Sequence, residues 1–423
     1  MRDRPRHRLA RRAAALTAAG SLAAVAGLAA ALVPWSWVPG GHLVPKAAGD
    51  LFTAAQIARA ERYSHVQRLL GWSSYFLSLG VLVLLGLTPL GSRLLRRLAP
   101  FRRWWLAIPV AVLLVLLVGR LVTLPFSIAS HRVDLSYGIS RQGWVGWSTD
   151  QLKGLLVSWV TTSLALLVLV GIARRSPRWW FAWAGGTAVG LSVAGSFLYP
   201  VLVEPLFSSF TPMAAGPFKQ SVFALADREG VHIDDVLVSD ASRRTTTLNA
   251  YVSGIGSTRR VVVYDNLLNE LSPDEARVVI AHELGHAKNK DVTLGTTLGA
   301  VGSVGGVAIL ALLLDTDRLR RWSATSGPGD PAAVALVIAL AAVGGFLVSP
   351  VQNTVSRAIE ARADRVAIET TGADATFVRM QQQLALRSLS DPTPPRLSQF
   401  WWGTHPTVLQ RAGLPASLRD AGR

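Results

Sequence analysis

The sequence predicts a mainly helical protein that crosses a membrane seven times and carries a polar domain with a small β-sheet. Half of the 423 residues are hydrophobic, only 16% are charged and the mean hydropathy is +0.34, which is too apolar for a water-soluble chain of this length. Seven apolar runs are each about 20 residues or longer, enough for a helix to cross a bilayer. They cover residues 13–33, 68–89, 104–127, 152–173, 179–199, 293–314 and 332–353.

The first apolar run is interpreted as an uncleaved membrane anchor. Its Ala-rich core resembles a signal peptide, and the small residues near Ala29 to Ala31 leave cleavage open as an alternative. The chain has no cysteine, so disulfide and thiolate chemistry are excluded. The run follows a basic tail that contains Arg2, Arg4, Arg6, Arg8, Arg11 and Arg12.

The net charge is +17. The arginines responsible for it lie at the ends of the apolar runs and do not form one basic patch, so we expect no nucleic-acid partner. Alternate loops are rich in arginine, and the positive-inside rule would place these loops in the cytoplasm and residues 200–292 outside. Trp104 and Trp179 at the ends of two runs suit the membrane interface. Besides the tail, the rich side has Arg93, Arg96, Arg97, Arg102, Arg103, Arg174, Arg175, Arg178, Arg318, Arg320 and Arg321.

We expect four parts along the chain. Residues 1–199 form a membrane domain of five helices, 200–292 the first half of a polar domain, 293–353 the last two membrane helices and 354–423 the second half of the polar domain. The predicted elements of 200–292 are an amphipathic helix from Phe218 to Arg228 and strands Asp235–Ser239, Thr245–Val252 and Arg260–Tyr264, with a turn at Gly254, Ile255 and Gly256.

A helix that starts at Ser272 carries the most informative motif. Ser272, Pro273 and Glu275 form a capping-box signature, and about two turns later come His282, Glu283 and His286. Histidines four residues apart share one helical face, so both can bind one zinc ion while Glu283 acts as general base. The motif alone arises by chance in roughly one such chain in a hundred, so its surroundings must support it.

The best third ligand for the zinc ion is Glu360. It shares a helical face with Asp364, whose carboxylate can orient a ligating histidine; a solvated charged face is the alternative. Two membrane crossings separate Glu360 from His282, so both lie on the same side of the bilayer, as a shared metal ion requires. The sequence therefore predicts a zinc metallopeptidase with one Zn²⁺ per chain.

The chain resembles the type 1 CAAX prenyl proteases, integral membrane zinc endopeptidases of the gluzincin type, from about residue 60 to 415. No single sequence match is specific for this family, but the whole set of matches in this order is. The matches are Leu124-Pro125-Phe126, Gly138, Asp150 to Lys153, Tyr199-Pro200, Glu204 to Phe207, Phe210 to Pro212, Asn249 to Tyr251, Gly254, Arg260 to Asp265, His282 to Asp291, Glu360, Ala363-Asp364, His405-Pro406 and Arg411.

The resemblance implies that seven membrane helices enclose a hollow chamber with the active site at its mouth. It implies that Asn249 and Ala250 belong to an edge strand that pairs with the substrate backbone. His405 would stabilise the oxyanion, with Asn249 as a second donor, and Arg411 would help to bind the substrate or position the tail. Without the resemblance, Asn249 would be interpreted as an ordinary polar residue in a strand, and His405 and Arg411 as ordinary surface residues.

The substrate and the orientation stay open at this stage. A composition rich in Ala, Arg and Leu is typical of a bacterial protein, for which prenylated substrates are not expected. From the resemblance we therefore take the peptidase activity but not the prenylated substrate. The expected substrates are peptides or membrane-associated proteins, with or without a lipid. The charge bias favours an extracytoplasmic catalytic side of the cell membrane, whereas the resemblance favours the cytoplasmic side. Alternative functions are a quality-control protease, or a transporter or non-catalytic scaffold; an intact Glu283 argues against a scaffold.

Overall fold

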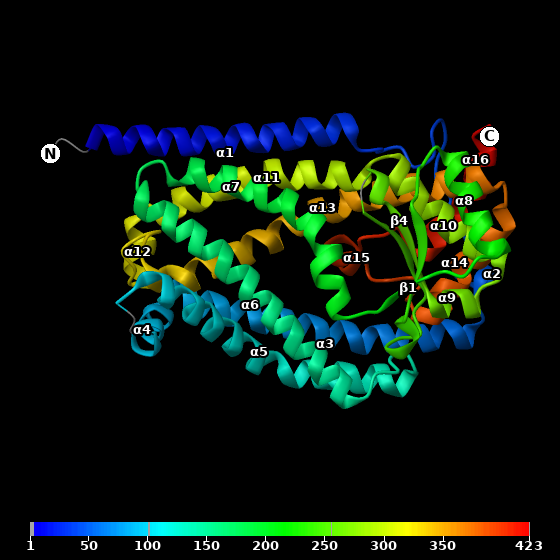
Figure 1. Ribbon diagram of the computed structural model, residues 1–423, viewed down its shortest axis with the longest axis horizontal. Coiled ribbons are helices and arrows are strands. Elements are labelled where there is room, and N and C mark those ends of the chain that lie inside the picture. Colours follow the sequence, from blue (N-terminus) through cyan, green and yellow to red (C-terminus); the bar gives the residue numbers. More distant parts are fainter. Residues whose placement is uncertain (1–3, 100–101, 255, 423) are drawn as a thin grey trace.

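Seven long helices form one end of the molecule and a compact αβ domain forms the other (Figure 1). The computed structural model describes residues 4–99, 102–254 and 256–422, so Arg2 and Ile255 lie outside the described residues. Among the described residues, seven helical segments are long and apolar enough to cross a membrane, which confirms the predicted number. The helices that carry them are α1 (Arg4–Leu32), α3 (Ala54–Leu87), α5 (Trp104–Tyr137), α6 (Trp144–Arg175), α7 (Trp180–Leu198), α11 (Asp291–Leu314) and α13 (Val334–Thr371).

The small sheet of the polar domain has the strand order β1-β2-β4-β3. Strand β4 (Arg260–Tyr264) is central, parallel to β2 (Asp235–Ser239) and antiparallel to β3 (Ala250–Ser253), and β1 (Phe210–Pro212) pairs with the other side of β2. Val261 and Val263 of β4 are fully buried and share one apolar core with α8 (Pro217–Glu229) and α10 (Pro273–Lys288). The predicted amphipathic helix is therefore confirmed as α8.

Shorter helices complete the fold. At the end that holds the sheet they are α2 (Ala48–Leu51), α9 (Asp265–Glu270), α14 (Asp374–Ser388), α15 (Arg396–Trp402) and α16 (Val408–Asp420), and at the opposite end they are α4 (Pro89–Leu98) and α12 (Asp317–Ser323). A π-helical turn (Tyr199–Val203), followed by a 3-10 turn (Glu204–Leu206), leads from α7 to the sheet; further 3-10 turns lie at Ala241–Arg243, Gly256–Thr258 and Pro331–Ala333.

Two boundaries differ from the sequence prediction. The predicted strand Thr245–Val252 was wrong at its start, because β3 covers only Ala250–Ser253. Thr245 and Thr246 instead bond to Ile139 at the end of α5, so this segment ties the sheet to a membrane helix. The expected boundary between residues 353 and 354 falls inside α13, which runs without a break from the membrane domain into the polar domain.

The arginine-rich loops gather at the end far from the sheet, where Figure 1 shows α4 and α12. Arg96 of α4 lies 3.3 Å from Asp330, and Arg174 at the end of α6 donates a hydrogen bond of 3.0 Å to the carbonyl of Gly329. The predicted grouping of these loops on one side is thus confirmed.

Two cavities lie next to α3, while the chamber enclosed by seven helices stays a prediction. One, of about 630 Å³, lies between α3, α5 and the segment around Thr245; the other, of about 910 Å³, extends to His405 and Arg411. Both are lined by Gln67 and Gly71 of α3, so together they connect the membrane helices with the polar domain.

Candidate active site

The helix that carries the predicted metal ligands starts with the capping box that the sequence predicts. Ser272 Oγ accepts from the backbone N–H of Glu275, and the backbone N–H of Ser272 donates to the Glu275 carboxylate at 3.0 Å. Pro273 occupies the first helical position, where its missing N–H costs nothing. The start of α10 is therefore fixed, and so is the face on which its histidines lie.

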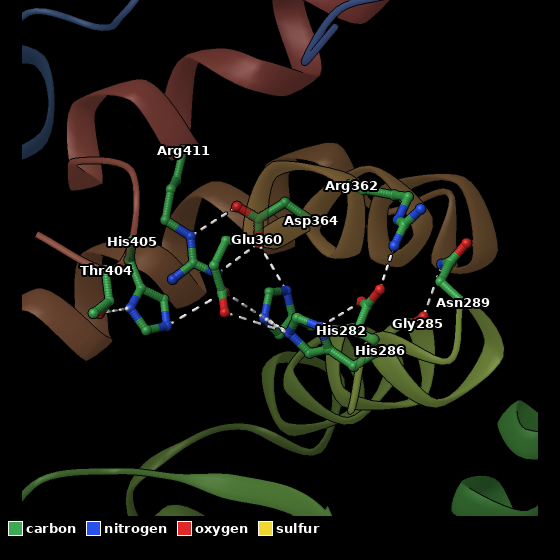
Figure 2. A network of polar contacts seen from close by, with 11 residues as sticks. His282, Gly285, His286, Asn289, Glu360, Arg362, Asp364, Thr404, His405 and Arg411 are labelled. Carbon is green, nitrogen blue, oxygen red and sulfur yellow. Dashed lines mark hydrogen bonds and ion pairs between the residues drawn. The ribbon is translucent and has the colours of Figure 1, made fainter. Parts of the chain in front are cut away.

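His282 and His286 lie one turn apart on that face, with their Nε2 atoms 3.2 Å from each other (Figure 2). Glu360 of α13 approaches from the opposite side: its carboxylate oxygens lie 3.2 Å from His282 Nε2 and 3.6 Å from His286 Nε2. One ligand atom from each of the three residues lies within 4.8 Å of the others. The structure thus brings together the three residues that the sequence predicts as ligands.

The absence of a side chain at Gly285 allows α10 and α13 to come this close. A Cβ atom at Gly285 would lie 3.2 Å from the Cβ and Cγ1 atoms of Val366 and 3.5 Å from the Cα atom of Ala363. Both neighbours belong to α13, close in sequence to Glu360, so the spacing between the two helices sets the distance between the histidines and the carboxylate.

A carboxylate holds the far nitrogen of each histidine. His282 Nδ1 lies 2.9 Å from Asp364, and His286 Nδ1 lies 2.9 Å from Asp291. A proton on each Nδ1 leaves a lone pair on each Nε2, so both lone pairs point into the same space as the Glu360 carboxylate.

These donors fit a cation. Catalytic zinc sites use the same ligand types, two imidazole nitrogens and a carboxylate oxygen. They also place a hydrogen-bonding carboxylate behind each imidazole ring, as here. Burial lowers the pKa of His282, but the carboxylates of Asp364 and Glu360 outweigh burial and raise that pKa to about 10. The same negative surroundings that would hold a proton on His282 attract a metal ion.

Glu283 lies next to the ligands, and its pKa is raised by burial. In the part of the chain that the structure describes, its carboxylate forms no hydrogen bond or ion pair. A half-buried carboxylate with a raised pKa and no partner among the described residues is suited to take up and release a proton.

His405 and Arg411 reach the site from the C-terminal segment. His405 Nε2 lies 3.3 Å from Glu360, while its Nδ1 lies 2.9 Å from the Thr404 hydroxyl. His405 lines the larger cavity, and desolvation there lowers its pKa. Arg411 also lines the cavity and binds Asp364 through two nitrogens, at 2.7 and 2.5 Å, so its guanidinium anchors α16 to the carboxylate behind His282.

The predicted edge strand is an edge, but Asn249 precedes it. Among the residues that the structure describes, strand β3 pairs with β4 alone, and its other side has no neighbour in the sheet. Asn249 is exposed and lies just before β3, while its backbone carbonyl accepts from Tyr264 N–H at 3.0 Å. Ala250 is buried within β3, which packs on α10.

Sequence reasoning missed Asp291 and Arg362. Lys290 takes a left-handed conformation (φ 56°) that ends the turn between α10 and α11, and this turn brings Asp291 back onto His286. Arg362 of α13 in turn holds Asp291. Asp291 follows His286 by five positions, and the two residues lie on different helices. This spacing matches no helical repeat, so only the geometry of the turn could have revealed the contact.

Seven membrane helices with this histidine and glutamate cluster at one end define an integral membrane metalloprotease. The sequence profile of peptidase family M48 matches residues 214–413, and the profile described as CAAX prenyl protease N-terminal, five membrane helices, matches residues 40–209. The chain belongs to peptidase family M48.

Similar proteins agree with this assignment. An uncharacterized metalloprotease of Bacillus subtilis, YhfN, is 32% identical over 84% of both chains. CAAX prenyl protease 1 of Saccharomyces cerevisiae is 33% identical over 39% of this chain and 37% of its own. The crystal structure of S. mikatae Ste24p has the same fold, with a TM-score of 0.77, 21% identity and coverage of 95% of this chain and 98% of that chain.

Proposed function

We propose that this membrane metalloprotease is a zinc endopeptidase in which His282, His286 and Glu360 hold the ion and Glu283 is the general base. The observation that carries this proposal is the convergence of three ligand atoms within 4.8 Å beside the half-buried carboxylate of Glu283, which has no hydrogen-bond or ion-pair partner among the described residues. A bound zinc ion would supply an acidified water molecule and polarise the scissile carbonyl.

Glu283 would transfer the proton during peptide hydrolysis. Its raised pKa keeps it able to take a proton from the attacking water and to pass it to the leaving amine. Asp364 and Asp291 keep the Nδ1 protons of the two histidines in place, so that neither ring donates a proton from the face that holds the metal ion.

His405 is the proposed donor to the oxyanion. Its Nε2 already lies 3.3 Å from Glu360, on the cavity side of the site, and its lowered pKa keeps the ring neutral, with one N–H, near pH 7. Asn249, exposed before the edge strand, is the second proposed donor. Each donor of this kind contributes about 3–4 kcal/mol in comparable sites.

The substrate would bind along β3. The free edge of this strand offers backbone N–H and C=O groups to an extended peptide, and Leu248, just before it, lines the cavity that holds His405 and Arg411. We propose peptides or membrane-associated proteins as substrates, because this cavity joins the one between α3 and α5 in the membrane domain. The names of the CAAX prenyl protease relatives make lipidated peptides one class to include.

Metal removal and return test the proposal. The detergent-purified chain is stripped with a chelator and reloaded with Zn²⁺, Mg²⁺ or Ca²⁺, and cleavage of a mixed library of plain and lipidated peptides is measured. We expect cleavage to disappear on stripping and to return with Zn²⁺ alone, because nitrogen ligands do not suit Mg²⁺ or Ca²⁺. Full cleavage by the stripped chain would contradict the proposal. Asp374→Asn, a change in an ion pair with Arg419 away from the metal cluster, is the matched control.

A further inference from the structure

Helix α15 and the residues that follow it, up to His405, form one segment, residues 396–405. The helix packs against α13, and its C-cap is Gly403, two residues before His405. Gln399, Trp402 and His405 of this segment line the cavity of about 910 Å³. The place of His405 in the cavity therefore depends on how segment 396–405 is held against α13.

Two side chains of α13 bind the carbonyl groups at the end of α15. The last carbonyls of a helix have no partner of their own within that helix, and a nearby arginine can bind them. Arg357 Nη1 donates to the carbonyl of Gln399 at 3.0 Å and to the carbonyl of Gly403 at 2.6 Å. Asn353 Nδ2 donates to the carbonyl of Trp401 at 2.5 Å. A charged donor forms a hydrogen bond about twice as strong as a neutral one, so Arg357 is the stronger of the two anchors.

The guanidinium of Arg357 is itself oriented by α13. Its Nη2 donates to the hydroxyl of Thr354 at 2.9 Å, one turn earlier on the same helix. The other nitrogen, Nη1, is thereby directed at the end of α15. Of the described hydrogen bonds from α13 to the backbone of segment 396–405, the one at Gly403 lies nearest to His405 along the chain.

Stacked rings also hold the segment, but they fix its position less closely. Trp401 stacks on Phe346 of α13 with ring centres 4.8 Å apart, and Trp402 stacks on Trp72 of α3 at 5.1 Å. Ring pairs are favourable over a range of separations of about 4.5–7 Å. Hydrogen bonds, in contrast, weaken steeply when their distance or angle changes. The rings therefore keep α15 against the two membrane helices, while the hydrogen bonds determine where along α13 it lies.

Two further contacts extend this positioning to the imidazole of His405. Gln399 Nε2 donates to the carbonyl of His405 at 2.6 Å. The amide of Gln399 passes over Gly403 on the way, at a place that an added Cβ would occupy. The hydroxyl of Thr404 lies 2.9 Å from His405 Nδ1. The backbone and the ring of His405 thus follow the position of the end of α15.

We propose that Arg357 is a positioning residue that sets the place of His405 relative to the metal ligands. Arg357 and Glu360 are three residues apart on α13, about 4.5 Å along the helix axis, and His405 Nε2 lies 3.3 Å from Glu360 (Figure 2). One helix therefore holds both a proposed metal ligand and the end of the segment that carries the proposed oxyanion donor. Misplacement of such a group by about 1 Å can cost about 10²-fold in rate. The positioning role rests on the proposed function of His405.

The kinetic test uses the zinc-loaded full chain and one peptide that the wild type cleaves in the library experiment. Arg357→Gln should lower kcat about 10- to 100-fold and leave KM within about twofold, because a displaced donor is lost mainly to the transition state. Since both changes disable the same donor, His405→Gln should cost less than about threefold more in the Arg357→Gln background. Arg357→Lys keeps a charged donor and should recover part of the loss. The control Arg396→Gln removes the same charge from an exposed position at the start of α15 and should behave as wild type.

The outcomes separate the positioning role from the proposed function. Unchanged kcat in Arg357→Gln beside a loss in His405→Gln would overturn the positioning role and leave the proposed function intact. Losses that multiply in full in the double variant would do the same. Unchanged kcat in His405→Gln would overturn the proposed function of His405, and the positioning role with it.

A second measurement does not depend on catalysis. Because the chain has no cysteine, Leu397→Cys, at a position of α15 that is 60% exposed, accepts a single spin label. The label should be more mobile in Arg357→Gln than in the otherwise wild-type chain, and Arg357→Lys should lie between them. Thermal unfolding and zinc content check that each variant is folded. Equal mobility of the label in all three chains would show that segment 396–405 keeps its place without the guanidinium, and would overturn the proposal.

Discussion

The carboxylate of Asp364 lies 2.9 Å from Nδ1 of His282, on the side of the ring that faces away from the three converging ligand atoms. Asp364 is fully buried, and its two oxygens also accept from Arg411 of α16. A chain of contacts therefore runs from the C-terminal helix through Asp364 to His282, a proposed metal ligand, and it keeps the imidazole in one orientation.

Asp364→Asn should weaken zinc binding by about 10- to 100-fold, because an amide supports the ring less strongly than a carboxylate. It also leaves the guanidinium of Arg411 buried without its anion, so the unfolding temperature should fall. Zinc affinity is measured by competition with a chromogenic chelator and unfolding by a thermal scan. Asp420→Asn on the exposed end of α16 is the control and should change neither. Unchanged zinc affinity in Asp364→Asn would contradict the orienting role.

Gly285→Ala should separate α10 from α13. The new methyl group would press on Val366 at 3.2 Å, and overpacking of this kind costs roughly 1–3 kcal/mol. Because Glu360 moves with α13, zinc affinity should fall as well. Gly295→Ala on α11, where an added Cβ meets no atom within 4 Å, is the matched control. Equal thermal stability and zinc affinity in the two variants would show that the helices can adjust without cost.

Glu229 of α8 predicts a pH dependence of stability. It is only 4% exposed, and burial raises its pKa to about 7, above the value of an unfolded chain. The folded state then prefers the protonated form, so stability is complete below about pH 4.5 and is lost as the pH rises toward about 7. Glu229→Gln, neutral and of the same shape, should raise the unfolding temperature at pH 8 and flatten its decline between pH 5 and 8.

The size of that effect has an upper limit of about 3 kcal/mol, from the shift between the two pKa values. Asp227→Asn, two residues away on the exposed face of α8, controls for the loss of a charge and should leave the pH profile as it is. A wild-type unfolding temperature that rises steadily from pH 5 to 8, with no change in Glu229→Gln, would contradict the prediction.

His405→Gln should lower kcat by about 10²- to 10³-fold with little change in KM, because an oxyanion donor acts mainly in the transition state. Zinc content should stay the same, since His405 is not among the three converging ligands. Steady-state kinetics and metal analysis on one preparation check both statements, and His232→Gln at an exposed position provides the control. A rise in KM at unchanged kcat would assign His405 to substrate binding instead.

The sequence alone was sufficient for the parts of the fold that follow from regular periodicity. Seven apolar runs predicted seven membrane helices, and the four-residue spacing of His282 and His286 predicted a shared face. The even number of crossings between His282 and Glu360 predicted that they share one side of the membrane, and the structure brings them to 3.2 Å. Each of these deductions needs only the helical repeat or a count of membrane crossings.

What the sequence did not predict depends on irregular backbone and on tertiary contacts. Asp291 reaches His286 because Lys290 takes a left-handed conformation, which local preference disfavours for a lysine. The residues from Thr245 to Asn249 have the composition of a strand, yet their hydrogen bonds go partly to Ile139 at the end of α5. Neither partner can be found without the arrangement of the helices.

The most direct test of the account is the comparison of Glu283→Gln with wild type for metal content and peptide cleavage on the same samples. Both should contain one equivalent of zinc, because Glu283 is not one of the three ligands, and the variant should lose about 10²- to 10⁴-fold in kcat because it has no base. Glu61→Gln, at an exposed position of α3, should behave as wild type. Full turnover by Glu283→Gln, or no zinc in either protein, would contradict the central claim.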